Sequence, residues 1–234
     1  MTFLGFHAII EEMKRKEGEA LLFHHYLWDF DGTLFNTYPH MTRAMQRALA
    51  ECGCEPPYEE IFFWMKRSVT QAIQHFQDAF PNLEALGNLG ERYQRHETED
   101  SQELVQPYEG IPQLLRDLQA RGGVHYLYTH RGASAFLHLK AFQMDGLFLD
   151  AVTAEDHFPS KPAPDAIQYL LQKHRIPSRE AVMMGDRDID VLAGQNAGIA
   201  GFLFDPNHFY SECGADLRCS SIQEMRSLLL GTDA

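Results

Sequence analysis

The feature that most constrains the fold is a regular alternation of short apolar runs and helical segments in the second half of the chain. Four runs have the length and composition of buried strands: VHYLYT (124–129), LFLDAV (147–152), AVMMGD (181–186) and IAGFLF (199–204). The segments between them have helical periodicity: 132–143, 163–174 and 189–197. Because parallel strands need long crossovers, usually helical ones, this alternation predicts an α/β fold with a Rossmann-like parallel sheet covered on both faces.

The first half of the chain has a different pattern. An apolar strand begins near residue 21 and runs into DFDGT (29–33), and helical patterns then follow over 40–52 and 58–100. IFFW (61–64) is too short to distinguish a strand from a helix. A break at PYEG (107–110) precedes a further helix over 111–120, and the last helical segment is 221–230.

These patterns predict three parts. Residues 21–37 and 107–234 form the α/β core, and residues 38–106 form an all-helical cap domain inserted after the first strand. The insertion begins directly after the acidic residues of DFDGT, so a lid function is expected of it. Residues 1–20 are predicted to be an N-terminal helical extension with apolar residues on one face.

Composition excludes several classes of protein. The formal charge of the 234 residues is −13, and no Lys/Arg run suggests a local nucleic-acid footprint. No apolar run approaches the roughly 20 residues that span a bilayer, and the N-terminus lacks the features of a signal peptide. The four cysteines show no zinc-binding spacing: Cys52, Cys54, Cys213 and Cys219. Four reduced thiols in a cytoplasmic protein is the favoured interpretation, with a Cys52–Cys54 or Cys213–Cys219 disulfide as the alternative.

Polar residues stand where the predicted strands end. Asp29 and Asp31 end the first strand, and Thr129 ends the second. Asp186 ends AVMMGD, and Lys161 lies in the loop FPSKPAP after LFLDAV. Since parallel sheets bind ligands at the carboxyl ends of their strands, these residues are expected to share one site.

The residue types in this site favour phosphoryl transfer. Asp29 and Asp186 offer hard oxygen ligands of the kind that Mg²⁺ takes, and a metal would offset the repulsion between buried carboxylates. Asp29 is then a candidate nucleophile that forms an aspartyl-phosphate. Asp31, two residues along an extended strand and therefore on the same side, is a candidate general acid and base.

The remaining candidates fit a phosphate. The Thr129 hydroxyl and the loop N–H groups after it suit phosphoryl oxygens, and Lys161 adds a compact positive charge. Asp186 and Asp190 are four residues apart, so that in a helix one takes the metal and the other orients a metal-bound water or Lys161. Asp188 points elsewhere and is expected to be solvated or paired with a neighbour such as Arg187.

The four motifs together resemble those of the haloacid dehalogenase-like (HAD) superfamily. They are DFDGT (29–33), Thr129 after an apolar strand, Lys161 in KPAPD, and GDRDID (185–190), and their order and spacing match over roughly residues 21–205. A helical cap between the first two motifs resembles the phosphoglycolate phosphatase and β-phosphoglucomutase branch. The second aspartate of DxD argues for phosphate rather than haloacid substrates.

The resemblance implies a role for each matching position. Asp29 would be the nucleophile and Asp31 the acid and base. The Mg²⁺ ligands would be Asp29, the Asp31 main-chain carbonyl and Asp186. The phosphate would be held by Thr129, the His130 N–H and Lys161.

The sequence departs from the family in two places. Asn36-Thr37 replaces the Asp-Ser or Asp-Thr that many relatives carry after DGT, and motif two continues as THRG (129–132) instead of a neutral pair. His130 and Arg131 are therefore candidates for contact with phosphate or substrate. His40, at the start of the cap, is a further candidate substrate contact, and Arg67 is one for specificity.

The predicted function is a Mg²⁺-dependent phosphatase acting on a small phosphorylated metabolite, phosphoglycolate-like or a sugar phosphate. A phosphomutase of the β-phosphoglucomutase type would use the same residues, and a non-catalytic phosphate-binding module is the alternative from another class. No nucleic-acid or membrane partner is expected. The sequence leaves open whether the protein is a monomer or a dimer.

Overall fold

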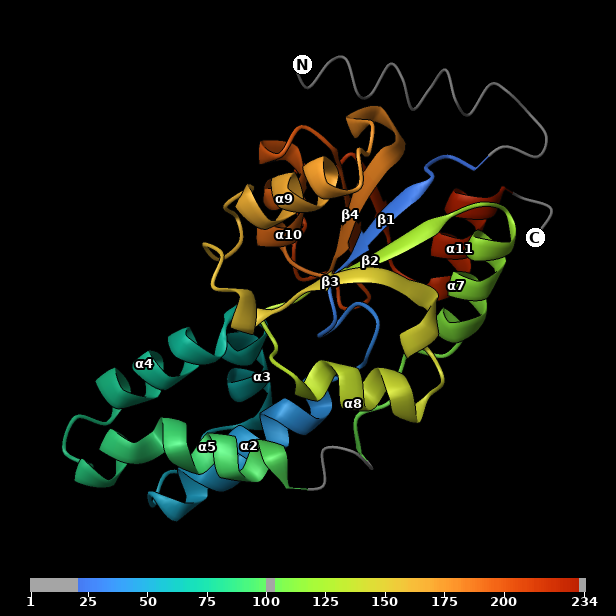
Figure 1. Ribbon diagram of the computed structural model, residues 1–234. Helices are drawn as coiled ribbons and strands as arrows, with labels where there is room; N and C mark the ends of the chain where they lie inside the picture. Colours follow the sequence, from blue (N-terminus) through green and yellow to red (C-terminus); the bar gives the residue numbers. More distant parts are fainter. Residues whose placement is uncertain (1–20, 100–103, 232–234) are drawn as a thin grey trace. The chain divides into compact units, whose positions relative to one another are not determined.

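The computed structural model describes residues 21–99 and 104–231 (Figure 1). The predicted N-terminal helical extension, residues 1–20, lies outside the described residues. The chain forms two compact units. Asn36–Gln106 make up one, called the helical unit below, and the described residues before and after it make up the other, called the α/β unit.

The α/β unit contains a six-stranded parallel sheet with the strand order β3-β2-β1-β4-β5-β6. Its strands are β1 His25–Trp28, β2 Val124–Tyr128, β3 Phe148–Val152, β4 Ala181–Gly185, β5 Ala200–Phe204 and β6 Leu217–Cys219. This confirms the predicted α/β class and its Rossmann-like parallel core. The sequence patterns did not predict β6, because three residues at the edge of a sheet are too few to show a periodicity.

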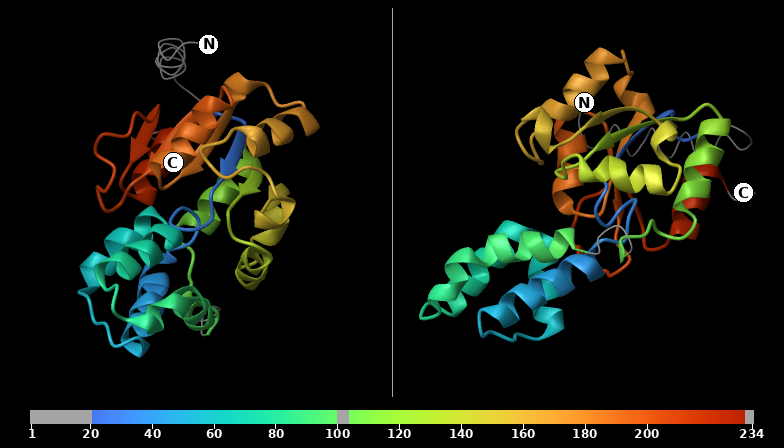
Figure 2. Two further views of the ribbon diagram at one scale, coloured as in Figure 1. Left: turned by 90° about the vertical axis from the view of Figure 1, so that its left-hand side faces the viewer. Right: turned by 60° about the horizontal axis from the view of Figure 1, so that its bottom comes forward.

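Helices cover both faces of this sheet, with α9 and α10 on one and α7 and α11 on the other (Figure 1). The helices are α7 Ile111–Ala120, α8 Ser134–Ala141, α9 Asp165–Lys173, α10 Asp188–Asn196 and α11 Ile222–Leu230. Three short 3₁₀ helices join them to strands: η2 Asp145–Leu147, η3 Ala154–Asp156 and η4 Ser178–Glu180. Figure 2 shows the same layers from two further sides.

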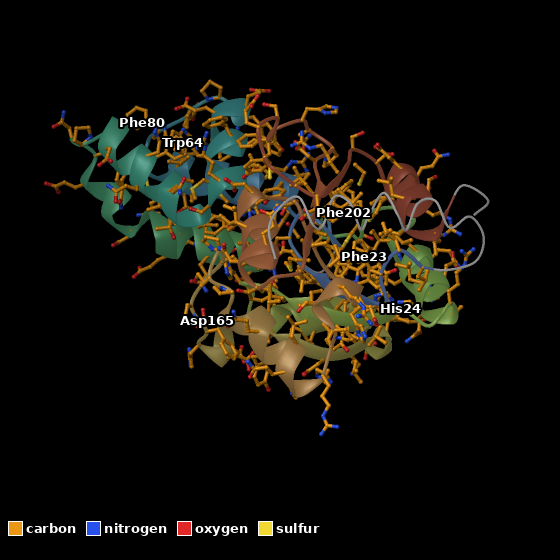
Figure 3. The ribbon with its side chains drawn as sticks, turned by 90° about the horizontal axis from the view of Figure 1, so that it is seen from above. Phe23, His24, Trp64, Phe80, Asp165 and Phe202 are labelled. Carbon is orange, nitrogen blue, oxygen red and sulfur yellow. The ribbon has the colours of Figure 1, made fainter. Side chains whose placement is uncertain are left out.

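Burial on both faces explains why the strands read as nearly continuous apolar runs. Every residue of β4 and β5 is buried. Phe23, just before β1, and Phe202, in β5, are almost fully buried in the interior of this unit (Figure 3). A core of aliphatic and aromatic side chains joins strands β1 to β4 to α9 and α10 and includes Leu27, Ile167 and Met183.

The helical unit has its own apolar core. Its helices are α2 Tyr38–Glu51, α3 Tyr58–Arg67, α4 Val69–Ala79, η1 Glu84–Asn88 and α5 Leu89–Thr98. IFFW lies within α3, so that the ambiguous segment is helical. The core side chains come from all of these helices and include Met45, Ile61, Phe76 and Leu89. The predicted cap, residues 38–106, falls within this unit.

The topology brings the ends of three strands together. Trp28, the last residue of β1, is in register with Leu127 of β2 and Met184 of β4. Because all three strands run in the same direction, the residues after each of them emerge at one edge of the sheet. None of the helices within the described residues has both the length and the apolar character that crossing a membrane requires.

Candidate active site

Asp29 lies at the end of β1, where the sheet still holds its backbone. Its N–H donates to the Met184 carbonyl at 2.8 Å, and its side chain is buried. Oδ1 accepts a hydrogen bond from Lys161 Nζ at 2.6 Å, while Oδ2 has no hydrogen-bond partner among the described residues. Burial raises the pKa of Asp29 to about 7, even though the ammonium of Lys161 favours its ionised form.

Asp31 has different surroundings although it is only two residues further on. The chain turns sharply after Phe30, whose carbonyl accepts the N–H groups of Leu34 at 3.1 Å and Phe35 at 3.0 Å. Gly32 takes a positive φ of 79° in this turn, which a residue with a Cβ adopts only at a cost. The Asp31 carboxylate is half-buried and pairs with Arg131, whose Nη2 lies 2.8 Å from Oδ1. The two acids therefore have separate cationic partners.

Lys161 is the centre of the buried part of the site. Its ammonium donates to the Tyr128 carbonyl at 3.0 Å and lies 2.7 Å from Asp190 Oδ1, besides its contact with Asp29. The side chain has no solvent exposure. Burial alone would lower the pKa of Lys161, but the two carboxylates outweigh it and raise the pKa above its usual value. The lysine therefore stays charged.

Asp190 reaches this lysine because of a glycine. In the first turn of α10, Asp190 Oδ2 accepts the Arg187 N–H at 3.1 Å. A Cβ added to Gly185, the last residue of β4, would lie only 2.1 Å from the Asp190 Cβ. No side chain fits there, so that glycine at 185 is what lets α10 approach β4 and places Asp190 over the strand end. Burial opposes ionisation, but Lys161 and Arg187 hold the pKa of Asp190 below its usual range.

The three buried acids form a candidate metal centre. One carboxylate oxygen each from Asp29, Asp186 and Asp190 lies within 4.8 Å of the other two. Lys161 contacts two of these carboxylates, those of Asp29 and Asp190, and Asp29 Oδ2 has no hydrogen-bond partner among the described residues. Hard oxygen donors in such a cluster fit a divalent cation such as Mg²⁺. The Asp31 side chain is not part of the cluster, because it is held by Arg131.

Thr129 and His130 occupy the loop after β2. Thr129 extends the pairing with β3 by donating its N–H to Val152 O at 3.0 Å, and its hydroxyl oxygen accepts the Arg131 N–H at 3.0 Å. The His130 ring accepts the Lys161 backbone N–H through Nε2 at 3.2 Å. Burial, reinforced by the nearby Lys161 charge, lowers the pKa of His130 to about 4, which keeps that nitrogen an acceptor.

A small cavity of about 150 Å³ adjoins these residues. Its lining comes from the strand ends and the loop before Lys161: Tyr128, Thr129, His130, Val152, Thr153, Ala154, Phe158, Pro159 and Ser160. The cavity lies beside the residues predicted to hold phosphate.

Two of the predicted residues belong to the helical unit. His40 is buried there, and its Nε2 donates to the Glu97 carbonyl at 2.7 Å. The guanidinium of Arg67 lies 4.6 Å from the centre of the Phe63 ring. Their contact with substrate stays a prediction.

Asp188, expected to lie away from the site, accepts the N–H of its neighbour Ile189 at 2.8 Å.

Two further residues, Asp205 and Tyr210, were not singled out from the sequence. Asp205 follows β5 directly, as Asp186 follows β4, and this signal was available in the sequence. Both of its oxygens accept backbone N–H groups, from Phe209 at 2.9 Å and from Tyr210 at 2.9 Å, so that it shapes a loop. Burial raises the pKa of Tyr210, and the charge of Asp186 adds to this, so the phenol lies near the acidic cluster. No local pattern identifies Tyr210.

The chain is similar to several known proteins. A family model described as haloacid dehalogenase-like hydrolase matches residues 26–203. Phosphoglycolate phosphatase of Vibrio parahaemolyticus is 28% identical over 187 residues, which cover 75% of this chain and 80% of the relative. Pyrophosphatase PpaX of Bacillus pumilus is 30% identical over 174 residues, covering 74% and 78%. The crystal structure of a predicted phosphoglycolate phosphatase from Haemophilus somnus 129PT superposes with a TM-score of 0.76 at 20% identity, covering 89% of this chain and 98% of that one.

Proposed function

The chain belongs to the haloacid dehalogenase-like hydrolase family, and we propose that it is a Mg²⁺-dependent phosphatase acting on a small phosphorylated metabolite. The relatives described above are a phosphoglycolate phosphatase and a pyrophosphatase, which places the chain among the phosphatases of the family. Phosphoglycolate-like esters and sugar phosphates are the proposed substrate class. The observation that carries the proposal is the convergence of Asp29, Asp186, Asp190 and Lys161 at one edge of the sheet.

In the first step Asp29 acts as the nucleophile. One of its carboxylate oxygens forms a bond to phosphorus while the ester P–O bond breaks, and the departing oxygen takes the proton of the Asp31 carboxyl group and leaves as an alcohol. In the second step the Asp31 carboxylate removes a proton from water. The water oxygen then bonds to phosphorus, the Asp29 O–P bond breaks, and inorganic phosphate is released.

The acidic cluster is the proposed Mg²⁺ site. Asp29 and Asp186, with the main-chain carbonyl of Asp31, are the proposed direct ligands. Asp190 completes the cluster and, with Oδ1 at 2.7 Å from Lys161 Nζ, orients that lysine. When bound, the metal supplies positive charge and Lewis acidity to the phosphoryl oxygens.

The phosphoryl group is proposed to be held by Thr129, the main-chain N–H of His130 and Lys161. A fixed ammonium beside the nucleophile stabilises the charge that the transition state spreads over the phosphoryl oxygens. The His130 ring supports this arrangement by accepting the Lys161 N–H. The negative charge of the chain, −13, supports a small metabolite over nucleic acid as the substrate. A cytoplasmic location belongs to the same proposal.

A panel of phosphate esters tests this function. Purified protein is incubated with p-nitrophenyl phosphate, 2-phosphoglycolate and several sugar phosphates, with Mg²⁺ or with EDTA, and released phosphate is measured. We expect hydrolysis with Mg²⁺, loss of activity with EDTA, and no activity in Asp29→Asn. Binding of phosphate without turnover of any ester would instead identify a non-catalytic module. Conversion of a hexose 1-phosphate to its 6-phosphate isomer would identify a mutase.

A further inference from the structure

The contact between Arg131 and Asp31 joins the loops that follow β2 and β1. Arg131 approaches the carboxylate side-on: Nη2 lies 2.8 Å from Oδ1, and Nε lies 3.2 Å from Oδ1 and 3.3 Å from Oδ2. The Arg131 side chain is 10% exposed and the Asp31 side chain 23% exposed, so solvent screens the pair only in part. Two donors on one planar group fix the plane of a carboxylate as well as its position.

Arg131 is itself held in place by the strand-end loop. Its N–H donates to the Thr129 hydroxyl oxygen at 3.0 Å, and its carbonyl accepts the Ala154 N–H at 3.3 Å. The guanidinium carbon lies 5.5 Å from the centre of the Phe30 ring, which stacks on Phe35 at 4.4 Å. The arginine therefore connects Asp31 to the same loop that carries the proposed phosphate-binding residues.

We infer that Arg131 is a positioning residue that fixes the Asp31 carboxyl group for proton transfer to the leaving group. This inference rests on the proposed function, in which Asp31 protonates the departing oxygen. Asp31 sits in a turn after the end of a strand, and its side chain is 23% exposed. The bidentate contact fixes the plane of its carboxyl group, and proton transfer is sensitive to such alignment.

The test compares leaving groups that differ in their need for a proton. Departure of p-nitrophenolate needs none, whereas an alkoxide must be protonated. We measure kcat/KM, which reports on the steps up to leaving-group release, for p-nitrophenyl phosphate and for the alkyl phosphate that wild-type protein hydrolyses best. In Arg131→Met we expect kcat/KM for the alkyl ester to fall by about 10- to 100-fold more than for the aryl ester. The ratio of the two values is independent of the fraction of folded enzyme.

Three further variants sharpen the result. Arg131→Lys keeps the charge but loses the fork, and its ratio should be intermediate. In an Asp31→Asn background, Arg131→Met should not change the ratio further, because the group it positions is gone. Arg226→Met is the matched control, since it removes an arginine–aspartate pair, Arg226–Asp117, between α11 and α7 of the same unit.

The outcomes separate this inference from the proposed function. An equal loss for both esters would show a structural role, and an equal rise in KM for both would show direct binding of the phosphoryl group by Arg131; either overturns the inference while leaving the phosphatase proposal intact. A wild-type protein that hydrolyses no ester overturns both.

Discussion

Asp29 and Asp31 are separated by one residue, yet the structure gives them opposite environments. Asp29 is buried against Lys161 and belongs to a cluster with Asp186 and Asp190. Asp31 is partly exposed and is held by Arg131 from the neighbouring loop. Two aspartates at the end of one strand therefore have different surroundings, because their cationic partners come from the loops after two different strands, β2 and β3. The proposed nucleophile must be ionised, and it is this buried acid whose surroundings oppose ionisation.

The electrostatic consequence is clearest for Asp29. Burial raises its pKa to about 7, with the charges of Asp190 and Asp186 acting in the same direction and Lys161 opposing them. A divalent cation in the cluster would favour the ionised carboxylate that acts as a nucleophile. The proposed metal would therefore act on the buried acid, whereas Arg131 supplies positive charge to the other acid.

The largest expected effect comes from exchanging each acid for its amide. Asp29→Asn should lower turnover by about 10⁴-fold or more, because no bond to phosphorus can form. Asp31→Asn should lower it by about 10²- to 10³-fold, because only proton transfer is lost. With p-nitrophenyl phosphate and acid quenching, intact-protein mass spectrometry should show a phosphorylated form in Asp31→Asn and none in Asp29→Asn. The reverse pattern would contradict the assigned roles.

The difference between the two acids marks how far the sequence could predict this site. Strand and helix periodicity was sufficient for the parallel sheet apart from its edge strand β6, and sheet geometry then predicted which loops lie together. Periodicity does not tell which residue a side chain contacts, because that depends on rotamers and on contacts between distant loops. Arg131 was thus only a candidate for phosphate or substrate contact, and its pairing with Asp31 could not be predicted.

Asp205 is a second case in which the sequence pattern does not predict the role of a residue. It follows β5 as Asp186 follows β4, but the chain after it folds back and donates two N–H groups to its carboxylate. Position at the end of a strand therefore does not by itself predict a role in the site. The difference lies in the next five residues, whose turn has no simple sequence signature.

Lys161→Met is the most direct test of the surroundings of the buried acid, Asp29. This variant leaves Asp29 and Asp190 without their common cation, and removal of one partner from a buried pair typically costs about 3–5 kcal/mol. We expect a loss of this order in the free energy of unfolding, measured by urea denaturation, together with loss of phosphatase activity. Mg²⁺ should recover part of the stability, because it replaces the missing charge.

Lys173→Met provides the control for this experiment. Lys173 also pairs with an aspartate, Asp150, but its side chain is 44% exposed. Exposed pairs contribute about 0–1 kcal/mol, so this variant should be nearly as stable as wild type. Equal losses of unfolding free energy in the two lysine variants would mean that burial does not strengthen the interactions of Lys161 with Asp29 and Asp190.

Gly185→Ala should also disturb the buried cluster, but it should lower stability by less than Lys161→Met does. The added Cβ would lie 2.1 Å from the Asp190 Cβ, so that α10 must shift and Asp190 must move away from Lys161. Overpacking of this kind costs about 1–3 kcal/mol. We expect weaker Mg²⁺ binding by calorimetry and a lower kcat. Gly146→Ala, whose added Cβ would meet no atom within 4 Å, should leave both unchanged. Unaltered Mg²⁺ binding in Gly185→Ala would argue against the role of Asp190.

The smallest expected effect concerns the stability of the fold at low pH, which limits the pH range over which the Asp29 and Asp31 variants can be compared. His125 is buried, and its neutral ring accepts the Trp28 Nε1–H at 3.0 Å and donates to the Leu115 carbonyl at 2.9 Å. Burial lowers its pKa from 6.5 to about 4, although the hydrogen bond to Leu115 opposes this. The unfolded chain therefore binds a proton more readily than the folded protein, and the contribution of His125 to stability, complete above pH 6.5, is lost as the pH falls toward 4.

Between pH 7 and pH 5 this linkage should cost the wild-type protein about 2 kcal/mol relative to His125→Gln, whose amide can replace both hydrogen bonds but does not titrate. Urea denaturation of the two proteins at both pH values isolates the effect, because every other titrating group is common to them. If the free energy of unfolding changes with pH equally in the two proteins, His125 does not set the lower pH limit of stability. If the profiles diverge as expected, activities of the Asp29 and Asp31 variants are comparable only above about pH 6.5, where the contribution of His125 to stability is complete.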